Sequence, residues 1–203
     1  MEKELNEKES LQLINSMIAE ARNNVSKGDG KILLFVGYSL VVISLLNAVL
    51  LHLLASPYMA SWVWFLMFPV TFLVFWCSGK LDKKALIRTH IDTIATKVWK
   101  CFVWSMILLF LLVIGFAIAL GNSGIEMMIT PMILLLVGFA QYVVGIAYKF
   151  KPFVRGALIF WLGSILCVVY FYFMREPSGQ YIIFALSVIG GFIVPGHILN
   201  RKV

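Results

Sequence analysis

Six apolar runs, each long enough to cross a lipid bilayer, constrain this chain more than any other feature of its sequence. A spanning helix needs about 20 mostly apolar residues at about 1.5 Å each. The runs cover residues 32–54, 59–77, 101–120, 127–147, 154–173 and 181–199, of which 59–77 is the weakest because it is short and contains Pro69. With 61% hydrophobic and 13% charged residues, the chain has too little charge for a water-soluble surface. The sequence predicts an all-α, polytopic membrane protein with a six-transmembrane-helix bundle over 32–200.

The positive charges indicate which way this bundle is oriented. Of the 17 Lys and Arg residues, 16 lie before the first run, between the second and third, between the fourth and fifth or at the very start of the fifth (Arg155), or after the sixth. Only Arg175 lies in another gap. Cytoplasmic loops accumulate Lys and Arg, because carrying a cation across against the membrane potential is unfavourable. We therefore expect a multi-pass protein of the cell inner (plasma) membrane with both termini in the cytoplasm.

Two cytoplasmic segments are predicted to be amphipathic helices, one within residues 1–31 and one over 80–98. Their apolar positions recur at helical spacing, and they are Leu11, Ile14, Ile18 and Ala21 in the first segment and Ile87, Ile91 and Ile94 in the second. The first segment is acidic and the second is basic, so we expect the two apolar stripes to pack on each other. The alternative is that each helix lies separately at the lipid surface.

Sequence motifs for catalysis, metal binding and cofactor binding are missing from the chain. The cores of the six runs contain no Asp, Glu, Lys or Arg, and the three histidines are far apart in sequence. None of the short motifs for zinc hydrolysis, acyl transfer or nucleotide binding occurs. The sequence thus predicts no catalytic residue, no metal, no cofactor and no enzymatic activity. The basic residues follow the membrane topology, so we expect no direct contact with nucleic acid.

A few polar side chains do fall within the apolar runs, and Asn47, Gln141 and Tyr142 are the most prominent. An amide surrounded by hydrocarbon needs a hydrogen-bond partner, so the first interpretation is that these groups join neighbouring helices. The alternative is a small polar cavity in which Asn47, Gln141 and Tyr142 contact a ligand.

The stretch INSMIAEARNN at Ile14–Asn24, followed by LLFVGY at Leu33–Tyr38, resembles the start of a family of small uncharacterised bacterial integral-membrane proteins with six helices. The likeness covers about the first quarter of the chain. The resemblance implies a membrane-embedded bundle. It also implies that some members of the family are encoded beside winged-helix transcription regulators. The resemblance assigns no activity and no functional residues.

Two functions are compatible with these patterns. The first is a non-enzymatic sensor or scaffold that couples the membrane bundle to a cytoplasmic protein partner. The second is a small transporter or channel for an uncharged or hydrophobic solute. The bilayer is a partner in either case, and the sequence leaves both the ligand and assembly into a homo-oligomer open.

Overall fold

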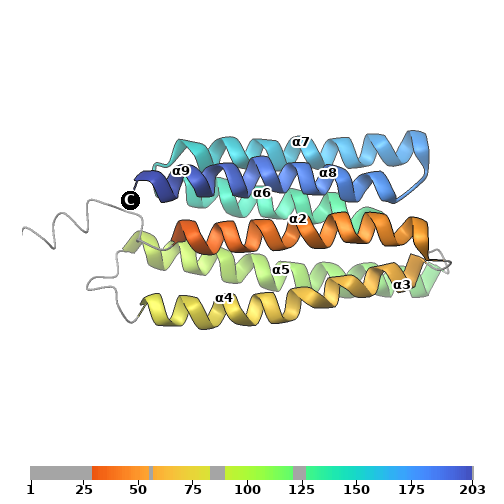
Figure 1. Ribbon diagram of the computed structural model, residues 1–203, viewed down its shortest axis with the longest axis horizontal. Helices are drawn as coiled ribbons and strands as arrows, with labels where there is room; N and C mark the ends of the chain where they lie inside the picture. The colour runs from red at the N-terminus through yellow and green to blue at the C-terminus, as the bar shows by residue number, and fades with distance from the viewer. Residues whose placement is uncertain (1–28, 55–56, 83–89, 121–126, 203) are drawn as a thin grey trace, which may run out of the picture.

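The computed structural model of the protein describes residues 29–54, 57–82, 90–120 and 127–202. Over these ranges the regular structure is helical, as the sequence predicts. The elements in chain order are α2 (Asp29–Leu53), α3 (Pro57–Ser61), η1 (Trp62–Leu66), α4 (Met67–Asp82), α5 (His90–Leu120), α6 (Ile129–Ala147), α7 (Lys151–Met174), α8 (Ser178–Val188), η3 (Ile189–Ile193) and α9 (Val194–Lys202). The helices run along one common long axis (Figure 1).

Five helical stretches in the described residues are long and apolar enough to cross a membrane. They are Gly30–Leu53, Ile91–Phe116, Ile129–Ala147, Lys151–Met174 and Ser178–Arg201. They correspond to the first and the last four predicted runs, with ends that differ by several residues because the helices continue into their polar flanks. A multi-pass membrane protein is therefore the class of protein that this architecture indicates.

The second predicted run is interrupted. Its apolar helical part, Met59–Val74, is shorter than the other five, and it includes the 3-10 segment η1. Pro69 explains the interruption, since proline has no N–H to donate to the carbonyl of Phe65 four residues earlier. In Figure 1, α3, η1 and α4 nevertheless follow one another along the long axis of the bundle. Passage of this segment through the membrane stays a prediction.

The last span lies at the centre of the bundle. In its most apolar window, 56% of the residues are buried, against 6% in the window of α5. The segments α8, η3 and α9 pack on α2 and α7, and α8 also contacts α6. By contrast, α5 packs chiefly on α6, and α4 packs on α2. The bundle thus has a well-buried centre and two peripheral helices.

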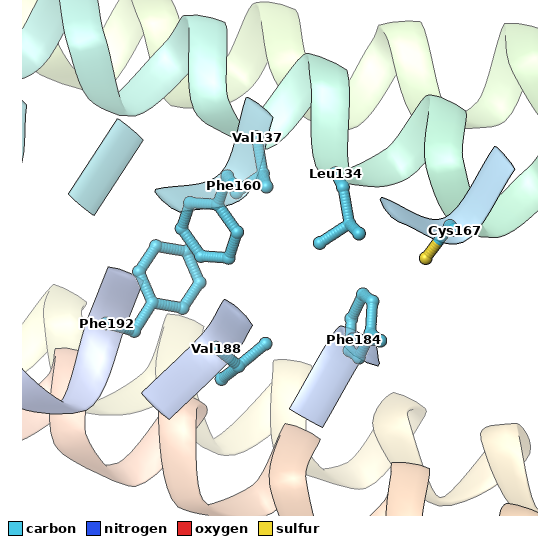
Figure 2. Packing of buried hydrophobic residues seen from close by; sticks show 7 residues of the cluster. All are labelled: Leu134, Val137, Phe160, Cys167, Phe184, Val188 and Phe192. Carbon is cyan, nitrogen blue, oxygen red and sulfur yellow. The ribbon is translucent and has the colours of Figure 1, made fainter. Parts of the chain in front are cut away.

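The hydrophobic core of the described residues contains one cluster of seven buried side chains, which α6 and α7 contribute from one side and α8 and η3 from the other. They are Leu134, Val137, Phe160, Cys167, Phe184, Val188 and Phe192. Figure 2 shows the rings of Phe160 and Phe192 side by side, and their centroids are 5.0 Å apart. Helices in lipid associate through close packing of this kind, since transfer from lipid to a protein core provides little hydrophobic driving force.

Basic residues gather at one end of the bundle. The start of α2, the end of α4, the start of α5, the turn between α6 and α7 and the C-terminus all lie at this end (Figure 1). The cations that these elements contribute include Lys31, Lys97, Lys100, Lys151 and Arg201. The helix α5 is continuous from His90 through the predicted third run, because neither Pro nor Gly interrupts it before Gly115.

Candidate functional site

Asn47 joins α2 to the segment that contains α3 and η1. Its side chain is completely buried. In the amide orientation that satisfies both groups, the nitrogen donates to the carbonyl oxygen of Ala60 at 2.8 Å, and the oxygen accepts from Nε1 of Trp64 at 3.0 Å. Both polar groups of Asn47 are therefore used in holding the interrupted segment against α2.

Gln141 is buried where α6 meets the last span. Its Nε2 atom donates to the carbonyl oxygen of Gly191 at 2.6 Å. That carbonyl belongs to η3, a π-helical segment in which the Val194 N–H donates to the carbonyl of Ile189, five residues earlier. Pro195 lies four residues after Gly191 and has no N–H, so the Gly191 carbonyl receives no α-helical donor from it. Gln141 supplies a donor in its place.

The junction around Gln141 is tightly packed against α7, and one of the two polar atoms of the Gln141 amide makes no hydrogen bond to a described residue there. A Cβ atom at Gly156 of α7 would lie 2.6 Å from Nε2 of Gln141 and 2.7 Å from the Gly191 carbonyl oxygen. Only a glycine at position 156 lets α7 and η3 approach this closely. Among the residues that the structure describes, Oε1 of Gln141 has no hydrogen-bond partner.

Tyr142 follows Gln141 on α6 but faces a different neighbour. Its ring is half-buried and lies 5.4 Å, between centroids, from the ring of Trp161 on α7. Nε1 of Trp161 in turn donates to the carbonyl of Leu135 at 3.3 Å. Tyr142 therefore contributes to the contact between α6 and α7.

The three predicted ligand-binding residues occupy two levels of the bundle. Trp64, the partner of Asn47, lies against Phe184, with ring centroids 5.8 Å apart. Gln141 instead meets the last span at Gly191. Seven residues of helix separate Phe184 from Gly191, which corresponds to about 10 Å along the axis. Asn47 is thus placed apart from Gln141 and Tyr142, and the observed hydrogen bonds of the two amides join helices.

Other buried polar side chains make the same kind of bond, in which a side chain donates to a backbone carbonyl of a neighbouring helix. The bonds run from Ser44 to Tyr181 at 2.7 Å, from Ser164 to Pro131 at 2.8 Å and from Gln180 to Cys167 at 3.4 Å. Hydrogen bonds of this type between membrane helices contribute about 0.6–2 kcal/mol each. Together they fasten α2, α6, α7 and α8 to one another.

The predicted contact between the two amphipathic stripes falls largely outside the described residues. The members of the stripes that lie outside are Leu11, Ile14, Ile18, Ala21 and Ile87. The two described members of the second stripe are on α5, where Ile91 is half-buried and Ile94 is exposed. The packing of the two stripes on each other stays a prediction.

The basic end of α5 is attached to α6 by a hydrogen bond. The hydroxyl of Tyr148 donates to Oδ1 of Asp92 at 2.8 Å. Further up the helix, Trp99 contacts Phe192 of η3, with ring centroids 6.2 Å apart. These contacts connect a peripheral helix to the central span near the Gln141 junction.

Replacing Tyr148 by Phe is expected to loosen the start of α5 while leaving the bundle folded. The substitution removes a hydrogen bond to a carboxylate, for which about 1.5–3 kcal/mol is typical. Hydrogen exchange of the backbone amides in 92–100 should become faster, and exchange in α7 should not change. Tyr142→Phe is a matched control on the same helix. Equal exchange in the two variants would show that the Asp92 bond contributes nothing.

A hollow of about 360 Å³ lies at the opposite end of the bundle, on α7. It is lined by Val168, Phe171, Tyr172 and Arg175. All four belong to one face of a single helix, so the hollow has no contribution from the polar groups described above. Elsewhere in the described ranges, His, Cys, Asp and Glu side chains do not gather in threes as a metal ion requires.

Comparisons with known protein families, with curated proteins and with solved structures find no match to this chain. The bacterial membrane-protein family suggested by Ile14–Asn24 and Leu33–Tyr38 therefore stays a prediction.

The partner of Gln141 was not predicted from the sequence. Gly191 and Pro195 are four residues apart, which is the spacing that leaves one helical carbonyl without a donor. That spacing, together with the adjacent Gly190, is a signal for an irregular helix in this span. The complementary glycine, Gly156, carries no such signal, because its role depends on how α7 crosses η3.

Proposed function

We propose that this protein is a non-enzymatic membrane sensor or scaffold, in which the bundle acts on a cytoplasmic protein partner through the basic end of α5. The observation that carries the proposal is the difference between the centre and the periphery. The central helices are fastened by buried hydrogen bonds, whereas only 6% of the residues in the apolar window of α5 are buried.

The helix α5 is suited to pass a signal because it is long and lightly held. It extends over 31 residues from His90 to Leu120, so its start projects beyond a segment that could span the bilayer. Its side chains Lys97 and Lys100 are exposed at the basic end. A movement of the bundle that displaces Trp99 would therefore be transmitted to a surface that a soluble partner can contact.

The proposal includes six crossings and a cytoplasmic location of both termini, in a bacterial inner membrane. The 16 cations predicted for one side support this orientation, because the ends of the described elements that carry them lie at one end of the bundle (Figure 1). The membrane-spanning role of α3, η1 and α4 is supported by their course alongside α2 and by the contacts of Asn47 with Ala60 and Trp64.

Cysteine labelling is expected to give opposite results at the two ends. In a chain with Cys77 and Cys101 replaced by Ser, a membrane-impermeant maleimide added to intact cells should label Glu176→Cys and spare Lys151→Cys. Both positions are exposed, so access to the side chain does not limit either reaction. Both should react after the membrane is permeabilised. The reverse pattern in intact cells would overturn the orientation.

A transporter or channel for an uncharged solute is the second candidate function. The irregular last span favours it, because several transporters bind substrate where a membrane helix is broken. In this alternative, Gln141 and Tyr142 contact the solute. Asn47 lies at a different depth in the bundle and does not contact it.

Two measurements separate these functions. A photoreactive amino acid is placed at Lys97, with Leu111 on the same helix as a control, since Leu111 is exposed within the predicted membrane region. We expect a discrete protein adduct at position 97 in cells and none at 111.

In proteoliposomes, we expect glycerol and urea to enter no faster than in protein-free vesicles. Solute entry that Gln141→Leu abolishes, with no adduct at position 97, would replace the sensor by the transporter.

A further inference from the structure

The last span consists of two α-helices joined by a segment of different geometry. The π-helical segment η3 contains the adjacent glycines 190 and 191, and Pro195 follows it at the beginning of α9. Single π-turns within α-helices are frequent at functional sites, and Pro and Gly account for most sharp changes in helix direction. This span therefore has a local structural reason to bend between Ile189 and Pro195.

The two halves of the span are fastened differently. The outer half, α8, takes part in bonds to two neighbours, a part-buried one from Ser44 to the Tyr181 carbonyl and a buried one from Gln180 to the Cys167 carbonyl. The inner half, α9, is bonded to α2 by the pair of Tyr38 and His197, whose hydroxyl oxygen and Nε2 atom lie 2.9 Å apart, and both of these side chains are exposed.

Glycines also form the surface on which α9 meets α2. A Cβ atom at Gly30 would lie 3.2 Å from the backbone nitrogen of Asn200 and 3.3 Å from the Gly196 carbonyl oxygen. A Cβ atom at Gly196 would lie 3.0 Å from Cδ2 of Leu34, so the Leu34 side chain of α2 packs directly on the backbone of α9. Neither glycine contributes a side chain that would have to change rotamer when the angle between α9 and α2 changes.

The bond from Gln141 to Gly191 holds the junction closed from the side of α6. In this arrangement, none of the described residues donates a hydrogen bond to Oε1 of Gln141. Pro195 has no N–H to offer the Gly191 carbonyl, so the regular helical pairing is interrupted there and the bond from Gln141 takes its place.

We infer that Ile189–Pro195 is a hinge and that Gln141 is the latch that holds it closed. When the latch opens, α9 pivots relative to α8 and carries His197 and Arg201 with it. The nine residues of α9 make a lever of about 14 Å. A change of about 20° in helix direction would move its end by about 5 Å. The use of this movement to signal to a partner rests on the proposed sensor function, whereas the hinge itself does not.

Spin-label distances in the full-length protein in lipid nanodiscs test the inference. Cys77 and Cys101 are replaced by Ser, and Cys167 is left because it has no exposed surface. An inner pair is placed at Asn200→Cys and Lys151→Cys, and an outer pair at Ile182→Cys and Met174→Cys. All four positions are exposed in the structure. The inner pair reports on α9 and the outer pair on α8, each relative to α7.

Gln141→Leu is expected to shift or broaden the inner distances by about 5 Å, the movement of the lever, and to leave the outer distances unchanged. Pro195→Ala is expected to give one narrow inner distribution, because the substituted alanine restores the helical N–H, and adding Gln141→Leu should then have no effect. The inference is wrong if Gln141→Leu leaves the inner distances as they are, or if it broadens both pairs equally. If the inner distances change as expected but no protein adduct forms at position 97, the hinge stands and the sensor function is wrong. If an adduct forms at position 97 but the inner distances do not change, the sensor function stands and the hinge is wrong.

Discussion

Gly156→Ala is expected to destabilise the bundle by about 2–3 kcal/mol, a typical cost of forcing extra volume into a packed interior. The new Cβ atom would lie 2.7 Å from the Gly191 carbonyl oxygen and 3.2 Å from the Gly191 Cα atom. These are backbone atoms, so no side-chain rotation can relieve the contact, and α7 has to move away from η3. The movement also strains the Gln141 bond. Unfolding in mixed micelles with increasing sodium dodecyl sulfate measures the free energy change.

Gly115→Ala is the matched control for this prediction. Gly115 also lies inside a membrane helix, but a Cβ atom there would meet nothing within 4 Å. The added methyl group should be tolerated, with a gain of up to about 1 kcal/mol from the higher helix propensity of Ala. If the two variants unfold alike, then the close approach of α7 and η3 does not contribute to the stability of the bundle.

A double-mutant cycle between Gln141 and Pro195 is expected to show strong coupling. In the natural chain, Gln141→Leu removes the donor for the Gly191 carbonyl, which should cost about 1–3 kcal/mol. In the Pro195→Ala background, the backbone N–H gained at position 195 can donate a hydrogen bond to the Gly191 carbonyl in place of Gln141. The same Gln141→Leu change should then cost little, which gives a coupling energy of about 1–2 kcal/mol. The free energies come from the same unfolding measurement.

Pro131→Ala provides the control background for this cycle. Pro131 lies in the first turn of α6, where helical N–H groups have no intrahelical acceptor, so its missing N–H deprives no carbonyl of a donor. Gln141→Leu should therefore cost as much in the Pro131→Ala chain as in the natural one. Additive effects in the Pro195→Ala background would mean that Gln141 does not substitute for the donor that Pro195 lacks.

The helical class and the placement of the long apolar helices could be predicted because they depend on local properties. Backbone groups in lipid have to be paired within the segment, so an apolar run of about 20 residues dictates a helix whatever surrounds it. The interruption at η1 is local as well, since Pro69 alone removes a helical hydrogen bond. The sequence marked Asn47 and Gln141 as amides that need partners, for the same reason.

The tertiary structure decided which partners these amides have. The sequence contains many carbonyl groups, and the choice of Ala60 and Trp64 for Asn47, or of Gly191 for Gln141, depends on how the helices are arranged around the last span. Periodicity could not reveal that the last span is central and that α5 is peripheral, because every face of a membrane helix is apolar. In a soluble protein, the polar face identifies the outside, whereas here lipid and protein interior have the same polarity, and only close packing at positions such as Gly156 distinguishes them.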